Sequence, residues 1–182
     1  MHMGVVADKH VVLIGMRGCG KSSVGRSLAE VLRRVHIDTD QLVIERAGQS
    51  IREIFETQGE AKFRAMEADA IAEVVGQAPV VISVGGGAVV SDQNARLLKE
   101  SGIIVWLTAP VEILWERIQR DQTSAQTRPA LTDRSGLDEL AYLFDQRRAI
   151  YERWTDVTIA TEGKSIDQVV RDVCIALASR DE

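Results

Sequence analysis

The chain has 182 residues, of which 45% are hydrophobic, and it carries a formal net charge of −5. This length fits one domain with a full hydrophobic core, and the acidic balance argues against a nucleic-acid-binding protein. No apolar run approaches the roughly 18–20 residues that a membrane span requires, so we expect neither a nucleic-acid partner nor a membrane. The two cysteines, Cys19 and Cys174, have no metal or redox spacing, which suits the reducing cytoplasm.

Apolar runs alternate with longer amphipathic segments along the chain. Strands are predicted at 10–15, 35–40, 80–85, 102–109 and 156–161. Helices are predicted over 21–34, 60–75, 111–120 and 165–178, with further starts at Ser50 and near Ser91. Near-continuous apolar strands separated by helices indicate a parallel sheet covered on both faces. We therefore expect a single α/β domain over 1–182, with residues 1–9 disordered.

Three glycines within six positions follow the first predicted strand, in the sequence GMRGCGKS (15–22). This segment fits G-x-x-x-x-G-K-[ST], whose backbone N–H groups surround phosphate oxygens at the start of a helix. We expect Lys21 to reach the β- and γ-phosphates and the Ser22 hydroxyl to bind Mg²⁺. The expected phosphate-binding residues are Gly15, Gly18, Cys19, Gly20, Lys21, Ser22 and Ser23. The chain is thus predicted to bind a nucleoside triphosphate. Because it has no NKxD-type guanine signature and is close to the minimum length for such a domain, a small-molecule kinase is favoured.

Two carboxylates, Asp38 and Asp40, end the second predicted strand. At the period of a strand both point the same way, towards the crevice where open α/β sheets bind ligands. One could hold Mg²⁺ through water while the other accepts a hydrogen bond from a substrate hydroxyl. The alternative is that Asp40 caps the helix that follows.

The sequence FRAME places Arg64 and Glu67 on one face of a predicted helix. They form either surface ion pairs, with Glu60 included, or a bidentate carboxylate clamp in which Glu67 holds Arg64.

The triplet Gly85, Gly86 and Gly87 ends the third predicted strand, at the same sheet edge as the aspartates. It either allows a ligand to approach the backbone closely or forms a simple flexible turn.

The polar segment 121–136 has no hydrophobic period, so we interpret it as a mobile lid. An arginine in such a loop, here Arg128, can stabilise a phosphoryl group during transfer.

Taken in chain order, GMRGCGKS, DTD, FRAME, GGG, RP (128–129) and R-x-x-x-Y (147–151) resemble the shikimate kinase family, over residues 10 to 178. The resemblance implies a P-loop fold like that of nucleoside monophosphate kinases, with five parallel strands in the order 2-3-1-4-5. It also implies transfer of the γ-phosphoryl group of ATP to the 3-hydroxyl of shikimate, with Mg²⁺, in aromatic amino-acid biosynthesis.

The same resemblance implies roles for individual residues. Lys21, Asp40 and Arg128 would be catalytic, Asp40 as the proton acceptor and Arg128 on the transferred phosphate of ATP. Ser22 and Asp38 would belong to the metal site, and Arg120 would lie against the adenine. Shikimate would be bound by Asp40, Arg64, Arg147 and the glycines Gly85, Gly86 and Gly87, with Arg148 as the alternative to Arg147.

Two other functions stay open beside this one. The first is a related P-loop kinase for another hydroxylated acid, such as gluconate. The second is a nucleotide-binding module without catalysis. Shikimate and ATP are the expected small-molecule partners, and we expect a monomer.

Overall fold

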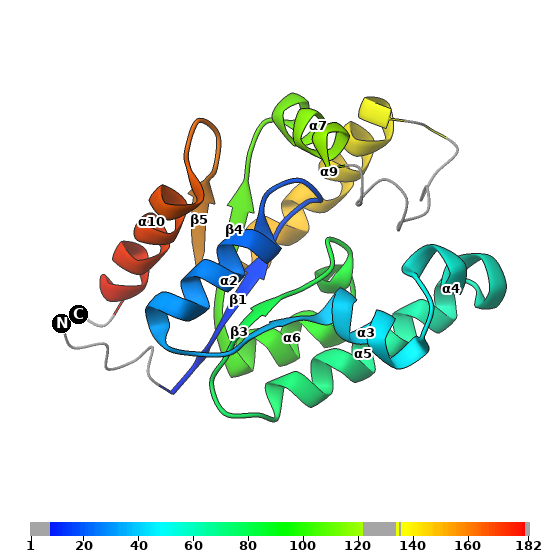
Figure 1. Cartoon of the computed structure of the whole chain (residues 1–182), viewed down its shortest axis with the longest axis horizontal. Helices are drawn as coiled ribbons and strands as arrows, with labels where there is room; N and C mark the ends of the chain where they lie inside the picture. Colours follow the sequence, from blue (N-terminus) through cyan, green and yellow to red (C-terminus); the bar gives the residue numbers. More distant parts are fainter. Residues whose placement is uncertain (1–7, 122–133, 135, 181–182) are drawn as a thin grey trace.

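Five parallel strands form the centre of the protein, in the order β2-β3-β1-β4-β5 (Figure 1). The computed structural model describes residues 8–121, 134 and 136–180. The strands are β1 (His10–Ile14), β2 (His36–Asp38), β3 (Val81–Ser83), β4 (Gly102–Thr108) and β5 (Val157–Ala160). This arrangement confirms the predicted fold class and strand order.

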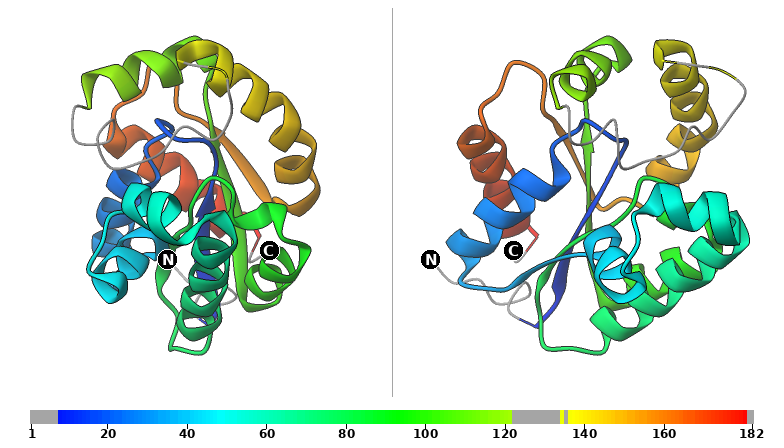
Figure 2. Two further views of the ribbon diagram at one scale, coloured as in Figure 1. Left: turned by 90° about the vertical axis from the view of Figure 1, so that its right-hand side faces the viewer. Right: turned by 45° about the vertical axis from the view of Figure 1, so that its right-hand side comes forward.

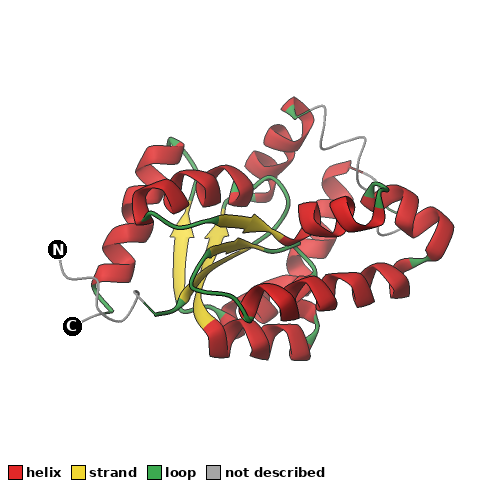
Figure 3. Cartoon of the chain, turned by 60° about the horizontal axis from the view of Figure 1, so that its bottom comes forward, coloured by secondary structure: helices red, strands yellow, loops and turns green. Residues whose placement is uncertain are grey.

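Helices cover both faces of the sheet (Figures 2 and 3). On one face α2 (Lys21–Leu32) and α10 (Ile166–Ala178) pack side by side. On the other, α5 (Glu60–Val75) packs against α6 (Asp92–Ser101). The remaining elements are α3 (Thr39–Ala47), α4 (Ile51–Gln58), the 3₁₀ turn η1 (Ala88–Val90), α7 (Val111–Arg120) and α9 (Gly136–Trp154).

Burial explains the apolar character of the central strands. Every residue of β1 is buried, as are the residues of β4 up to its last position, because helices cover these strands on both sides. The edge strand β5 buries only Ile159. Among the described residues, no helix has both the length and the apolar character needed to cross a membrane.

Local capping signals identify two helix starts correctly. Ser50 and Glu53 form a capping box at α4, and Ser165 and Gln168 form another at α10. In each case the serine side chain accepts from a backbone N–H that the helix leaves unpaired. The side chain of the residue three positions later accepts in turn from the backbone N–H of the serine.

Three elements differ most from the sequence prediction. The strand predicted over 80–85 covers only Val81–Ser83. The strand predicted over 35–40 ends at Asp38, because α3 begins at Thr39. Helix α9 was not among the predicted elements, although it is the longest helix described. Residues 1–7 and most of 121–136 lie outside the described residues, so the disorder expected at 1–9 and the lid remain predictions.

Asp156, just before β5, joins several elements at the amino end of the sheet. Its carboxylate accepts from the backbone N–H of Ile104 in β4 (3.0 Å) and pairs with Lys99 of α6 (2.7 Å) and Arg180 beyond α10 (2.9 Å). Burial alone would raise the pKa of Asp156, but the bonds from Lys99 and Ile104 outweigh it and hold the pKa below its ordinary value.

We predict that Asp156→Asn lowers the free energy of unfolding at pH 7 by about 1 kcal/mol, since it removes two partly exposed ion pairs and keeps the backbone bond. The folded protein binds a proton at Asp156 more weakly than the unfolded chain does. The contribution is therefore complete above the unfolded pKa of about 4 and is lost as the pH falls below it. Urea unfolding of both proteins at pH 7 and pH 3 measures this. A difference that is equal or larger at pH 3 would contradict the prediction.

Candidate active site

The loop between β1 and α2 has the backbone that a phosphate-binding loop requires. Gly18 has φ +82°, and a Cβ there would lie 2.6 Å from the carbonyl oxygen of Leu114. Gly20 is the residue before α2 and has no side chain to cap it, so the first-turn N–H groups of the helix have no cap from that position. Open N–H groups and the helix dipole make this terminus a binding site for anions.

Lys21 directs its ammonium group back over this loop. Its Nζ donates to the carbonyl oxygens of Gly15 (2.9 Å) and Met16 (3.0 Å). The positive charge therefore lies within the loop, where it can meet phosphate oxygens.

The end of β2 lies directly beside the start of α2. The Ser22 hydroxyl donates to Asp38 Oδ2 (2.6 Å), while Asp38 Oδ1 accepts from the backbone N–H groups of Asp40 and Gln41. Asp38 is thus the cap of α3, whereas the sequence had offered Asp40 for that role. Asp40 lies in the first turn of α3 and is 7% exposed. The period of a strand does not apply to it, because the strand has already ended.

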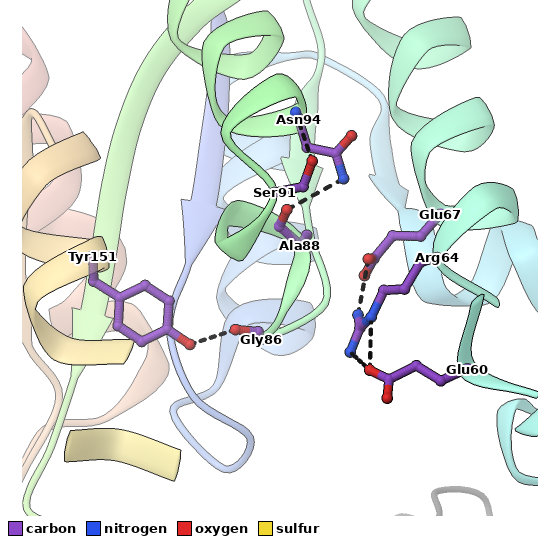
Figure 4. A network of polar contacts seen from close by, with 8 residues as sticks. All are labelled: Glu60, Arg64, Glu67, Gly86, Ala88, Ser91, Asn94 and Tyr151. Atoms are coloured by element: carbon purple, nitrogen blue, oxygen red, sulfur yellow. Dashed lines mark hydrogen bonds and ion pairs between the residues drawn. The ribbon is translucent and has the colours of Figure 1, made fainter. Parts of the chain in front are cut away.

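A half-buried Arg64 and a buried Glu67 form an ion pair on α5 (Figure 4). Arg64 Nη1 donates to Glu67 Oε2 (2.9 Å), and Arg64 Nε and Nη2 donate to Glu60 Oε1 (3.2 and 3.1 Å). The Glu60 side chain is 60% exposed but that of Glu67 is only 2% exposed. A surface ion pair alone therefore does not describe the arrangement, because Glu67 fixes Arg64 from inside the protein.

Burial raises the pKa of Glu67, and the nearby charge of Asp40 adds to the rise, while Arg64 opposes it. Glu67 Oε1 is buried and has no hydrogen-bond partner among the residues that the structure describes. The carboxylates of Asp40 and Glu67 and the guanidinium of Arg64 thus lie close together.

Two glycines of the triplet after β3, Gly85 and Gly87, lie so close to these side chains that an added Cβ would force the side chains to shift. A Cβ at Gly85 would lie 2.6 Å from Asp40 Oδ1 and 2.8 Å from Glu67 Oε1. A Cβ at Gly87 would lie 3.0 Å from both terminal nitrogens of Arg64. The triplet is therefore one wall of the charged cluster and more than a flexible turn.

Of the two neighbouring arginines on α9, Arg147 lines the pocket and Arg148 does not. Arg147 is half-buried, lines the same pocket as Arg64, and has Nη1 3.5 Å from the position of a Cβ on Gly86. The Arg148 side chain is 61% exposed and pairs with Glu152.

These groups line one pocket that has both charged and apolar residues. Its charged residues are Arg17, Asp40, Arg64, Glu67, Glu139 and Arg147, beside the glycine triplet. Its apolar residues include Met16, Ile51, Phe55, Phe63, Leu140 and Leu143. A second groove shares Asp40 and contains Ser22 and Asp38. Asp40 therefore lies between the charged pocket and the phosphate-loop side.

Helix α7 carries two arginines near its end, and Arg117 is the one that contacts the phosphate loop. The Arg120 side chain is 81% exposed and pairs with Glu116. Arg117, one turn earlier, donates to the carbonyl oxygens of Gly18 (3.4 Å) and Thr161 (2.8 Å). The sequence reasoning missed Arg117, since only packing shows which face of α7 meets the loop. Arg128 lies outside the described residues.

A partly buried chain of hydrogen bonds fixes the first turn of α2. His36 Nε2 bonds to Ser83 Oγ (2.9 Å), and Ser83 Oγ donates to the carbonyl oxygen of Lys21 (3.1 Å). Gly25 makes room for the imidazole, because a Cβ there would lie 2.4 Å from Nε2. Burial lowers the pKa of His36. No sequence motif marks this chain.

The chain was compared with known proteins. A sequence model of the family described as "Shikimate kinase" matches residues 17–178. A shikimate kinase of Geobacter sulfurreducens is 41% identical over 172 residues, which cover 94% of this chain and 92% of that protein. The chain belongs to the shikimate kinase family.

Solved structures agree with this family assignment. A shikimate kinase from Acinetobacter baumannii, in complex with shikimate, superposes with a TM-score of 0.89 at 31% identity and covers 96% of each chain. A gluconokinase from Sinorhizobium meliloti reaches 0.66 at 20% identity over 95% of this chain and 93% of its own, a likeness of fold alone. The predictions of the shikimate kinase family and of a kinase are confirmed.

The tight packing at Gly85 leads to a prediction about stability. Gly85→Ala should lower the free energy of unfolding by about 1–3 kcal/mol, because the added methyl group forces apart two carboxylates that are themselves buried. Gly76→Ala is the matched control: its nearest atom is 3.5 Å from the new Cβ and its φ is −80°. Urea unfolding of both variants is the measurement. Equal effects at the two sites would contradict the packing described here.

Proposed function

We propose that the protein transfers the γ-phosphoryl group of ATP to the 3-hydroxyl of shikimate, giving shikimate 3-phosphate and ADP. One observation carries this proposal. The buried carboxylate of Asp40 lines both the groove that contains Ser22 and Asp38 and the pocket that contains two half-buried arginines, Arg64 and Arg147. An alcohol that also bears a carboxylate fits this arrangement, because the arginines can bind its charge while Asp40 contacts its hydroxyl.

The grouping of the pocket's arginines agrees with such a substrate. Three arginines (17, 64 and 147) and three carboxylates (40, 67 and 139) line the pocket, so their formal charges balance. A substrate carboxylate would therefore be bound locally, by the donors of Arg64 and Arg147, and not by a net positive charge. The apolar residues of the pocket suit the carbon ring of shikimate. The arginines can hold the ring carboxylate through paired N–H donors while Gly85, Gly86 and Gly87 border the ring.

ATP is proposed to bind along the loop Gly15–Ser23. Its phosphates would lie against Gly18, Cys19, Gly20 and the first turn of α2, with Lys21 on the β- and γ-phosphates. Arg120 is proposed to lie against the adenine, and Arg117, which donates to Gly18 and Thr161, is proposed to hold the phosphate loop beside it. Arg128 is proposed to contact the transferred phosphate.

The residues at the groove fit a magnesium ion. The Ser22 hydroxyl and the Asp38 carboxylate lie 2.6 Å apart beside the phosphate loop, and hard oxygen ligands of this kind suit Mg²⁺. Among the described residues no group of three or more His, Cys, Asp or Glu could hold a metal ion, so most ligands would come from phosphates and water. When bound, the ion neutralises charge on the phosphates.

In the proposed mechanism the protein positions and stabilises more than it reacts. Arg64 and Arg147 orient shikimate so that its 3-hydroxyl faces Asp40, which accepts the hydroxyl proton as the oxygen attacks the γ-phosphorus. Lys21 stabilises the charge that develops on the phosphate oxygens while the bond to ADP breaks.

We also propose that the protein acts in the cytoplasm as a monomer, without a nucleic-acid partner. The free thiols of Cys19 and Cys174 support the cytoplasm, and the net charge of −5 supports the lack of a nucleic-acid partner.

A coupled ADP-release assay with shikimate, quinate and gluconate in parallel tests the function. We expect release only, or far more strongly, with shikimate. Preference for gluconate would favour the related kinase, and ATP binding without substrate-dependent release would favour a non-catalytic module.

Asp40→Asn should reduce turnover by about 10²–10⁴ with little change in ATP affinity, because the amide keeps the shape but cannot accept the proton. Asp38 remains available to cap α3, so the variant should fold. Steady-state kinetics and ATP titration measure the two effects. A variant with a normal rate and only a lower melting temperature would show Asp40 to be structural.

Arg147→Ala should raise the KM for shikimate by about tenfold or more and leave the KM for ATP nearly unchanged, since it removes one paired donor from the substrate carboxylate. Arg148→Ala is the matched control, because its side chain is exposed and pairs with Glu152. It should behave like the unmodified protein. The opposite pattern would show that Arg148, and not Arg147, binds the substrate carboxylate.

A further inference from the structure

Tyr151 of α9 brings one hydroxyl group to both substrate loops (Figure 4). The residue is fully buried, and its hydroxyl donates to the carbonyl oxygen of Gly86 at 2.5 Å. The same oxygen lies 3.4 Å from Met16 Sδ. Gly86 belongs to the glycine triplet and Met16 to the phosphate loop, so a single group contacts the loops proposed to bind shikimate and ATP.

The tyrosine ring is itself held in place. It packs against Trp106 of β4 with the ring centroids 5.6 Å apart. Because Trp106 belongs to a central strand of the sheet, the position of the hydroxyl is fixed by the core. The Gly86 carbonyl, which lies in a loop with no regular strand pairing, is thereby tied to the most rigid part of the fold.

Arg147 precedes Tyr151 by one helical turn and faces the same glycine. A Cβ on Gly86 would lie 3.5 Å from Arg147 Nη1 and 3.7 Å from the Tyr151 hydroxyl. Burial raises the pKa of Tyr151 well above its ordinary value, and the Arg147 charge offsets only part of the rise. The hydroxyl therefore stays protonated at neutral pH and keeps its role as donor to Gly86.

We propose that Tyr151 is a positioning residue for shikimate, whose hydroxyl fixes the Gly86 backbone and the Arg147 guanidinium relative to the phosphate loop. This inference rests on the roles of the glycine triplet and Arg147 in the function proposed above. A tyrosine that served packing alone would affect stability and not the affinity for one substrate of two.

The variant Tyr151→Phe tests this, because it removes the hydroxyl and keeps the ring against Trp106. We expect the KM for shikimate to rise about tenfold and the KM for ATP to stay within about twofold. The other tyrosine of the chain, Tyr142, lies on the same helix with 37% exposure, and Tyr142→Phe should change neither value. An unchanged KM for shikimate, or an equal rise for both substrates, would overturn the proposal.

A double-mutant cycle with Arg147→Lys separates positioning from packing. If Tyr151 acts through Arg147 and its loop, the two substitutions should be non-additive in the KM for shikimate. Strictly additive effects would overturn that link. An unmodified protein without shikimate-dependent ADP release would refute the proposed function, whereas an active protein indifferent to Tyr151→Phe would refute this inference alone.

A spectroscopic test does not depend on the folding of Tyr151→Phe. Labelling Tyr142→Phe with 3-fluorotyrosine leaves one ¹⁹F resonance, that of Tyr151, since the chain has two tyrosines. Titration with shikimate should shift this resonance along the binding curve. A resonance that does not move at saturating shikimate would overturn the proposal.

Discussion

The register of the parallel sheet is the constraint on which the site depends. Leu13 of β1 and Asp38 of β2 both lie opposite Ser83 of β3, so these three strands reach the same edge at the same level. The phosphate loop, the start of α3 and the glycine triplet all begin within a few residues of that level. A shift of one strand by a single residue would turn its side chains to the other face and separate these segments.

The site also collects positive charge within an acidic protein. Arg64 can remain in a half-buried position because Glu67 is buried behind it and Glu60 lies on its outer side. The charged form of Glu67 is destabilised by its removal from water, and its raised pKa reflects this. The guanidinium is thereby oriented before a ligand arrives, so binding requires little further ordering of that side chain.

Local signals predicted much of this fold, whereas packing decided the rest. The capping pairs at Ser50 and Ser165 are visible in the sequence, because both partners lie within four residues. The partner of Tyr151, by contrast, is a backbone carbonyl 65 residues away, and no local pattern encodes it. Arg117 and Arg120 differ by one turn of α7, and only contact with Gly18 distinguishes them. The sequence did not show that β2 ends at Asp38. There the side chain caps α3, so the alternation of strand side chains stops at that residue.

The ion pairs of Asp156 lie at the end of the sheet opposite the site, and this separation has an evolutionary consequence. Its bonds to Lys99, Arg180 and Ile104 hold two helices and two strands together without contact with the charged pocket. Substitutions in the pocket leave these ion pairs intact, so the amino end of the sheet keeps its own contacts when the pocket changes. A fold arranged in this way can diversify its chemistry at one end while the other end preserves its architecture.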